Sequence, residues 1–320
     1  MGSAYVNPQS QAPLHNPLEV TLSGMTLKNP LIPASGTFGY GMDFLDFFDV
    51  NEVGSFSIKG TTLHPRKGNP LPRIAEASGG MLNAVGLQNP GAQAVVSEIF
   101  PKLREIYHGK VLANVSGFSV EEYRECARIL QEDDLVGIIE LNISCPNVHG
   151  GGMAFGTDPA AAVEVLKAVK QVTQKPVYVK CTPQCTDLVT MCQKLEDAGA
   201  DGLVLLNTYL GMRLDLKTGR PLLKNVTGGL SGPGIFPLAL YQIYRIAPLV
   251  HIPIIGCGGV ASAEDVVEMM LAGASAVEIG TASLIDPLTI PKILQRLPLL
   301  LEELKVTSVK DLRARSLNSV

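Results

Sequence analysis

Residues 137–159 read GIIELNISCPNVHGGGMAFGTDP and decide how the chain is interpreted. The stretch begins with a short apolar run that is typical of a buried strand, and it ends with a capping residue and a helix start at Pro159. Between these lies a loop with several glycines and one cysteine, Cys145, flanked by Asn142 and Asn147. An α/β barrel keeps its active site on loops that follow strand ends in this way.

Strand-like and helix-like segments alternate along the rest of the chain. Eight segments are expected to be strands, at 30–34, 54–59, 111–115, 137–142, 177–181, 202–206, 252–256 and 276–280. Helical patterns are clearest at 119–131, 159–173, 187–198, 235–247, 263–272 and 288–304. Strands that alternate with helices pair in parallel, and eight of them close a barrel. We therefore predict an α/β protein with a (β/α)8 TIM barrel.

Three further segments are expected to surround this barrel. Residues 18–28 alternate in polarity and break at a Ser-Gly pair, which predicts an N-terminal hairpin, placed at the bottom of the barrel. Long insertions rich in Gly and Pro follow strands 2 and 6, at 60–90 and 207–234, and the second contains a hairpin turn at 217–219. Loops that follow barrel strands lie on the catalytic face, so both insertions would cover the site.

Composition restricts the domain organisation and the class of function. The chain has 320 residues, 46% of them hydrophobic, which suits one large domain. We assign residues 18–320 to a single barrel domain and the polar residues 1–17 to a flexible lead-in. The net charge is −4, aromatic residues are only 5%, and no apolar stretch is long enough to span a bilayer. These features argue against a nucleic-acid surface and a membrane span.

The cysteines favour a reducing compartment and no metal. There are six, at positions 126, 145, 181, 185, 192 and 257, without the paired spacing of a zinc site. We interpret them as reduced thiols of a cytoplasmic protein. Cys181 and Cys185 are close enough in sequence to suggest a metal site, but no second pair or histidine cluster supports one.

Glycines and lysines follow several predicted strands. Glycines end strand 7 at 256–259 and strand 8 at Gly280, where barrels usually bind phosphate through bare backbone amides. The alternative is that these glycines only make tight turns. Lys59 and Lys180 each end an apolar strand, so each would point into the barrel mouth and need a partner charge. A bound phosphate, carboxylate or reduced flavin could supply that charge, and the alternative is an ion pair with a carboxylate of the barrel.

Asparagines are the other group at the predicted barrel mouth. They are Asn83, Asn114, Asn142, Asn147 and Asn207. A primary amide carries two donors and one acceptor on a planar head, so several amides around one cavity suit a planar ring with alternating N–H and C=O groups. A pyrimidine or an isoalloxazine fits that description. Each asparagine alone could equally be a turn residue.

Cys145 is the candidate for proton transfer. A buried, inert thiol is the common alternative, but Pro146 would stiffen its turn and the glycines beyond would let the loop open and close. A thiol can exchange a proton near neutral pH when its pKa is modestly lowered. A nucleophilic role needs a histidine, and His149 is expected on the flexible loop, so we favour acid–base chemistry.

At these residues the chain resembles a known family. The string ELNISCPN followed by HGGGMAFGTDP is similar to the catalytic loop of class 1 dihydroorotate dehydrogenases, closest to the class 1B catalytic subunit. The similarity extends from about residue 18 through ordered motifs, including NPLIPASGTFGYG (29–41), IKGTTLHPRKGNPLPR (58–73), GMLNAVGLQNPG (80–91), VKCTP (179–183), GGLSGPGI (228–235) and IIGCGGV (254–260). The resemblance implies an FMN-bearing TIM barrel, with one FMN per chain, that oxidises dihydroorotate to orotate in pyrimidine (UMP) biosynthesis.

The resemblance also implies residue roles. Cys145 would take the proton from substrate C5 while a hydride passes from C6 to flavin N5. The substrate-binding residues would be Lys59, Asn83, Ala84, Val85, Gly86, Leu87, Asn142, Asn147, Asn207 and Thr208. The flavin-binding residues would be Ser35, Lys59, Gly60, Asn114, Asn142, Lys180 and Leu206, with Gly232, Gly258, Gly259, Gly280 and Thr281 at the phosphate.

Class 1B membership implies a partner. The resemblance predicts a homodimer flanked by two electron-transfer subunits, a heterotetramer in which FAD and a 2Fe–2S cluster reside on the partner and pass electrons to NAD. The chain itself has no four-cysteine cluster motif and no GxGxxG after a strand, so we expect it to reduce NAD poorly alone. Fumarate or a quinone as acceptor stays open.

Three other interpretations compete with this one. A tRNA dihydrouridine synthase shares the Asn-x-x-Cys-Pro loop and FMN, but this chain lacks a basic C-terminal domain and its net charge is negative. A dihydropyrimidine dehydrogenase-like barrel would normally carry fused iron–sulfur domains. A non-catalytic barrel would be expected to have lost the base or the lysines, and all are present.

Overall fold

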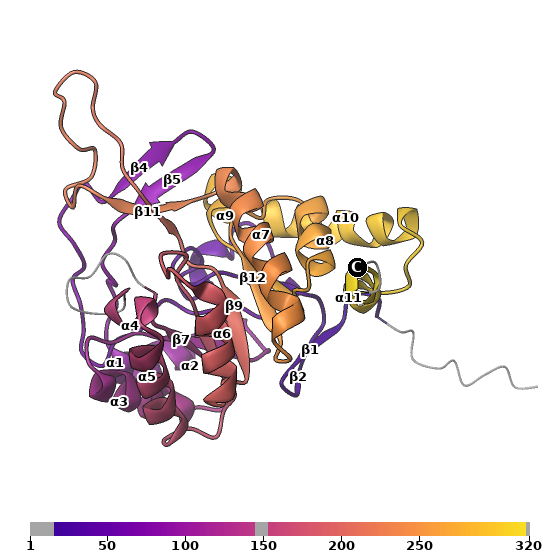
Figure 1. Ribbon diagram of the computed structural model, residues 1–320, viewed down its shortest axis with the longest axis horizontal. Coiled ribbons are helices and arrows are strands. Elements are labelled where there is room, and N and C mark those ends of the chain that lie inside the picture. The colour runs from indigo at the N-terminus through magenta and orange to yellow at the C-terminus, as the bar shows by residue number, and fades with distance from the viewer. Residues whose placement is uncertain (1–15, 145–152, 318–320) are drawn as a thin grey trace, which may run out of the picture.

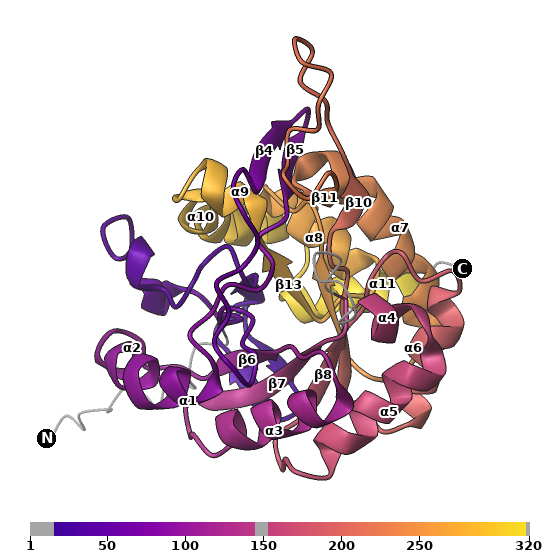
Figure 2. The same ribbon diagram turned by 90° about the vertical axis from the view of Figure 1, so that its left-hand side faces the viewer.

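A curled parallel sheet forms the centre of the molecule. The computed structural model of the chain describes residues 16–144 and 153–317. In spatial order the sheet contains β3 (Leu31–Pro33), β13 (Ala276–Ile279), β12 (Ile254–Cys257), β9 (Gly202–Leu205), β8 (Val177–Lys180), β7 (Val136–Asn142) and β6 (Val111–Val115). Every neighbouring pair is parallel, and Figure 2 shows the strands curling inside a ring of helices. All seven fall within two residues of their predicted bounds.

The eighth strand position of the barrel is taken by an extended segment, residues 54–59, which forms only isolated β-bridges. We expected a full strand at 54–59. Its backbone instead touches the two edge strands alternately: Ser57 N donates to Pro33 O of β3 at 3.0 Å, and Ile58 N donates to Leu112 O of β6 at 3.0 Å. Residues 57 and 61 also bridge to β6 in parallel. The segment therefore closes the sheet, and the predicted (β/α)8 barrel is confirmed.

Six helices follow the prediction closely. They are α3 (Val120–Gln131), α5 (Pro159–Lys170), α6 (Leu188–Asp197), α7 (Phe236–Ile246), α8 (Ala263–Leu271) and α10 (Thr289–Glu303). Side-chain caps fix several starts. Asp158 caps α5, which has Pro159 as its first residue, and Ser262 with Asp265 forms a capping box at α8.

Shorter elements fill the connections, and the sequence analysis did not define them. They are α1 (Ala92–Ala94), a π-helical turn at Val95–Ile99, α2 (Phe100–Ile106), α4 (Met153–Thr157), α9 (Thr281–Ile285), α11 (Val309–Leu317) and 3₁₀ turns at Met42–Phe44, Val50–Glu52, Pro233–Ile235 and Ala247–Leu249. The C-terminal α11 packs on α8, and Val309 N donates to Pro17 O at 2.8 Å.

The N-terminal hairpin lies at the bottom of the barrel, as expected. It consists of antiparallel β1 (Val20–Leu22) and β2 (Met25–Leu27). Its turn residue Ser23 lies 2.9 Å, Oγ to OH, from Tyr178 at the start of β8. Figure 1 shows this hairpin at the end of the molecule opposite β4, β5 and β11.

The two long insertions pair with each other at the other end. The first contributes β4 (Ile74–Ala77) and β5 (Gly80–Asn83), and the second contributes β10 (Tyr209–Gly211) and β11 (Gly228–Ser231). They form one antiparallel sheet in the order β10-β11-β5-β4. Leu82, Ala84 and Leu223 form a small core beneath it. The expected hairpin turn within residues 207–234 is also present, because Gly219 N donates to Asp215 O at 2.8 Å.

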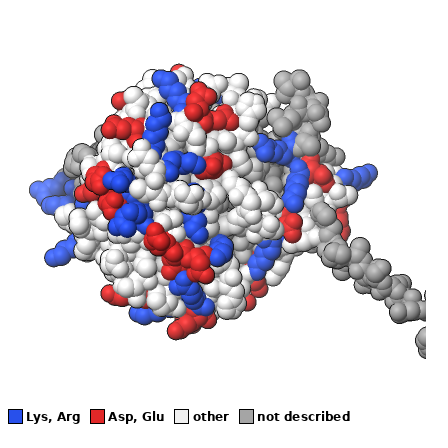
Figure 3. All heavy atoms as spheres, turned by 90° about the horizontal axis from the view of Figure 1, so that it is seen from below, with Lys and Arg blue, Asp and Glu red and all other residues white. Residues whose placement is uncertain are grey.

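The surface has mixed charge on the face drawn in Figure 3, where basic and acidic side chains are interspersed. Across residues 16–144 and 153–317, none of the helices combines the length and the apolar character that crossing a bilayer requires.

Candidate active site

A cavity opens at the C-terminal ends of the barrel strands, beneath the sheet of the two insertions. It holds about 1210 Å³ of empty space, including its opening to solvent. The residues predicted to contact a flavin all line it: Ser35, Lys59, Gly60, Asn114, Asn142, Lys180, Leu206, Gly232, Gly258, Gly259, Gly280 and Thr281. Parallel strands end together at this face, which explains how residues so distant in sequence meet.

Most of the predicted substrate residues lie at the same cavity. Lys59, Asn83, Val85, Gly86, Leu87, Asn142, Asn207 and Thr208 line it. Ala84 does not, because its side chain packs with Leu82 and Leu223 under the insertion sheet. Cys145 and Asn147 lie outside the described residues, so their roles stay predictions.

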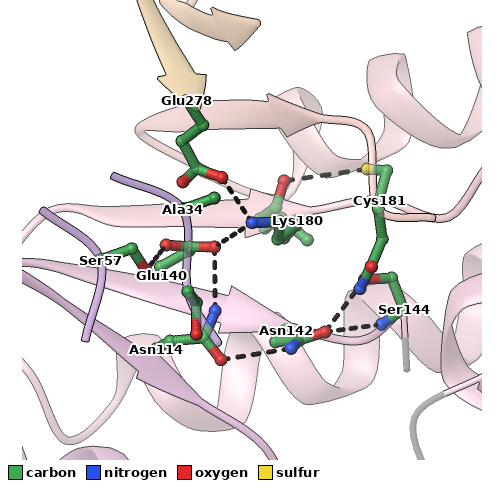
Figure 4. A network of polar contacts seen from close by, with 12 residues as sticks. Ala34, Ser57, Asn114, Glu140, Asn142, Ser144, Lys180, Cys181 and Glu278 are labelled. Atoms are coloured by element: carbon green, nitrogen blue, oxygen red, sulfur yellow. Dashed lines mark hydrogen bonds and ion pairs between the residues drawn. The ribbon is translucent and has the colours of Figure 1, made fainter. Parts of the chain in front are cut away.

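Lys180 is held by two buried carboxylates (Figure 4). Its Nζ lies 2.9 Å from Glu140 Oε1 on β7 and 2.5 Å from Glu278 Oε2 on β13. Of the two alternatives for this lysine, the ion pair with barrel carboxylates is therefore present, although Lys180 also lines the cavity. The sequence analysis missed both glutamates. Their signal was a single acid inside each of two apolar strand runs, GIIELN and AVEIG.

Burial and charge set the protonation of this cluster. Burial disfavours the charged form of Lys180, but the facing Glu140 and Glu278 outweigh it and raise its pKa well above the ordinary value. Burial, with repulsion from Glu140, raises the pKa of Glu278 to about 7, although Lys180 opposes the change. The lysine is thus ammonium at neutral pH, and Glu278 is the group poised to titrate.

A chain of amides extends from this cluster along the cavity wall. Asn114 Nδ2 donates to Glu140 Oε1 at 2.9 Å, and Asn142 Nδ2 donates to Asn114 Oδ1 at 3.2 Å. Ser144 Oγ donates to Asn142 Oδ1 at 2.9 Å and accepts from Asn207 Nδ2 at 2.7 Å. Each asparagine uses one N–H of its amide in this chain and keeps a second N–H. The Glu140 carboxylate at one end therefore orients a row of hydrogen-bond donors.

The glycine loops fit both interpretations given above. A Cβ on Gly259, whose φ is +80°, would lie 2.5 Å from Phe236 N, so loop packing alone requires glycine there. At Gly280 the nearest atoms to an added Cβ lie 3.6 Å away, in Ala34 and Thr37. An added Cβ would make only ordinary van der Waals contacts there, so packing does not demand glycine at this position on the cavity wall.

A metal has no evident place in the described part of the chain. Among residues 16–144 and 153–317, no three His, Cys, Asp or Glu side chains come together in a way that could hold an ion. Cys181 and Cys185 are buried free thiols there.

Comparison of the sequence with known proteins identifies the family of the chain. A family model described as dihydroorotate dehydrogenase matches residues 17–301. The chain belongs to the dihydroorotate dehydrogenase family. It is 52% identical, over 94% of its length and 96% of the relative's, to the "Dihydroorotate dehydrogenase B (NAD(+)), catalytic subunit" of Geobacillus sp. strain WCH70. Proteins with the same name from Bacillus cytotoxicus and Anoxybacillus flavithermus are 51% and 52% identical over 95% of this chain.

The family match covers the residues that surround the cavity. The matched region runs from the residues before β1 into α10, so it includes every strand of the barrel and both insertions. Helix α11 lies beyond it, against α8. In this dihydroorotate dehydrogenase family member, the Lys180 cluster and the amide row lie within the matched region.

Proposed function

We propose that the chain oxidises (S)-dihydroorotate to orotate in de novo pyrimidine biosynthesis, with one FMN bound in the barrel cavity. The near-full-length similarity to catalytic subunits named as dihydroorotate dehydrogenase B carries this proposal. The cavity supports it independently, because cationic and amide groups gather around a space at the catalytic face of a TIM barrel.

The residues present suit FMN. The backbone at Gly280 and the neighbouring loops at Gly232, Gly258 and Gly259, all of which line the cavity, would hold the phosphate. Lys180 would face the part of the ring that gains negative charge, while Asn114 and Asn142 would offer the donors described above. When bound, FMN supplies the acceptor for the two electrons of the substrate's C5–C6 bond.

The protein's own groups bind the substrate and move its proton. Lys59 would pair with the substrate carboxylate, and Asn83, Asn142, Asn147, Asn207 and Thr208 would bond the pyrimidine edge. Cys145 would remove the C5 proton as general base. The insertion sheet above the cavity would exclude water from the reacting atoms.

We further propose that electrons leave to NAD through a partner subunit that carries FAD and a 2Fe–2S cluster, around a homodimer of this chain. The term "catalytic subunit" and the mention of NAD(+) in the names of the relatives support this assembly. The proposal includes a cytoplasmic location, with which the free thiols at 126, 181, 185, 192 and 257 agree.

The test is the visible spectrum of the purified chain before and after anaerobic dihydroorotate. We expect a flavin spectrum that bleaches with dihydroorotate but not with dihydrouracil, which lacks the carboxylate that Lys59 would bind. Bleaching by dihydrouracil alone would instead identify a different pyrimidine reductase. A chain that binds no FMN would remove the basis of the proposal.

A further inference from the structure

The buried cluster beneath the cavity has one carboxylate more than it has cations. Glu140, Lys180 and Glu278 are all almost completely shielded from solvent. With all three ionised the cluster carries a net charge of −1. An excess charge in a barrel core is costly unless a proton or another partner offsets it.

The two carboxylates differ in how well they are satisfied. Glu140 accepts from Lys180, from Asn114 and, through Oε2, from Ser57 Oγ. Glu278 pairs with Lys180 through Oε2, but its Oε1 accepts no hydrogen bond with acceptable geometry from the described residues. Such hydrogen bonds stabilise the ionised form of a carboxyl group, so the excess proton belongs on Glu278 rather than on Glu140.

Cys257 connects Glu278 with the cavity. Cys257 and Glu278 are register partners on the adjacent strands β12 and β13, so their side chains share one face of the sheet, and Cys257 lines the cavity whereas Glu278 does not. Burial, with a smaller contribution from Glu278, raises the pKa of Cys257, so the thiol stays neutral near pH 7. The groups that face Glu278 are therefore one cation, one other carboxylate and one neutral thiol.

We propose that Glu278 is a positioning residue that stores a proton: it binds one proton when negative charge is placed opposite Lys180 and releases it when that charge leaves. This inference rests on the proposed function, which delivers that charge through the flavin. Its basis is the shared lysine, the unsatisfied Oε1 and the position of Cys257, which pairs with Glu278 across the two strands and lines the cavity.

The step balances in charge and atoms. Dihydroorotate loses two electrons and two protons as it becomes orotate. With FMN bound, one proton would accompany the electrons to the flavin, which would then carry one negative charge, and the other would go to the general base. Above neutral pH, where Glu278 begins ionised, it takes up one proton from solvent on the Cys257 side. The cluster plus ring keeps a total charge of −1 before and after, and the proton departs when the electrons do.

The midpoint potential of the bound flavin, measured against pH, tests this. One proton per two electrons changes the potential by about 30 mV per pH unit, and two protons change it by about 59 mV. Because the pKa of Glu278 is about 7, the wild-type slope should steepen from about 30 to about 59 mV as pH rises through neutrality. Protonation of the flavin ring itself would steepen the slope in the opposite direction, as pH falls.

Glu278→Gln should hold a slope of about 30 mV per pH unit throughout. The matched control is Glu302→Gln, the same change on the exposed side of α10, which should keep the wild-type curve. Infrared difference spectra of the wild type should also gain a protonated carboxyl C=O band on reduction at pH 8, and Glu278→Gln should lack it.

The outcomes separate this inference from the proposed function. A chain that takes up no flavin overturns the function. A flavin that bleaches with dihydroorotate, while the wild-type slope stays near 30 mV per pH unit above neutrality, overturns the proton store and leaves the function intact. That decision needs only the wild type, so it holds even if Glu278→Gln fails to fold. A steep slope that persists in Glu278→Gln also overturns the inference.

Discussion

At the scale of single residues, the candidate site is a set of polar groups that fix one another. Glu140 is its anchor, because it orients both the Lys180 ammonium and the Asn114 amide. The amide row then sets the orientation of Asn142 and Asn207 through Ser144. Donors that are fixed before a ligand arrives lose little entropy on binding, which favours a rigid planar ligand.

Cys145→Ala is expected to keep FMN bound and to slow flavin reduction by dihydroorotate about 10²- to 10⁴-fold, because proton transfer loses its base. Cys145→Ser should retain a small rate that rises with pH. Anaerobic stopped-flow absorbance measures both. Cys185→Ala, which removes a thiol outside the cavity lining, is the control and should stay near the wild type. Near-normal reduction in Cys145→Ala would exclude the proposed base.

Lys59→Ala is expected to raise KM for dihydroorotate and also to slow flavin reduction, because this lysine would touch both the substrate carboxylate and the flavin. A hydrogen bond to a charged group is worth about 1.5–3 kcal/mol, so the KM should rise roughly 10- to 100-fold. Lys67→Ala, which changes an exposed lysine on the insertion that follows Lys59, is the comparison. Steady-state kinetics that match between the two variants would refute the role.

Residue types at strand ends could be predicted because strand periodicity fixes where each strand stops. For that reason the cavity is lined by Lys59, Asn114, Asn142, Lys180 and Asn207. The partner of Lys180 could not be predicted, since it depends on which side chains of β7 and β13 face each other across the barrel. The local sequence around Lys180 carries no information about contacts with residues so far away in the chain.

At the scale of elements, the unexpected features are long-range or irregular. The two insertions are 146 positions apart at the Asn83–Gly229 contact, yet they share one sheet. The segment at 92–106 was not defined as a helix because a π-helical turn at Val95–Ile99 shifts its apolar face and Pro101 follows at once. The strand expected at 54–59 forms only bridges because its hydrogen bonds alternate between two neighbours.

Leu223→Ala should loosen the sheet of the two insertions without unfolding the barrel. Leu223 is 2% exposed and packs with Leu82 in a core separate from the barrel core. Loss of a buried leucine costs about 2–5 kcal/mol, and here the loss is local. We expect a higher KM for dihydroorotate and faster hydrogen exchange in β5 and β11, because β5 carries Asn83 to the cavity.

The control for this element is Leu216→Ala, in the same insertion. Leu216 is 98% exposed, so its removal should change neither KM nor hydrogen exchange. Equal exchange rates in the two variants would show that the small core does not hold the sheet in place.

At the scale of the whole molecule, the barrel buries a titratable carboxyl group, Glu278, so the stability of the fold depends on its protonation. Among the described residues, the other buried polar side chains are neutral, so Glu140, Lys180 and Glu278 are the charged residues of the core. Surface acids such as Asp134 and Asp311 behave differently, because hydrogen bonds lower their pKa values and their contribution is lost only as pH falls below about 3.9. The two effects therefore act in separate pH ranges.

The flavin-free chain should lose stability as pH rises from about 4.5 to about 7, because folding raises the pKa of Glu278 from 4.5 to about 7. In that range the folded state holds a proton that the unfolded state has released, so raising the pH favours unfolding. The full difference corresponds to roughly 3 kcal/mol. Glu278→Gln has no such proton, so its stability relative to the wild type should increase across this range.

Urea unfolding of both proteins between pH 5 and pH 8 measures this difference. Histidines also titrate in this interval, but both proteins contain the same histidines, so their contribution cancels in the comparison. Glu302→Gln should follow the wild type at every pH, because that side chain is exposed. Parallel curves for the wild type and Glu278→Gln would mean that Glu278 stays ionised in the folded barrel, with Lys180 alone compensating both carboxylates.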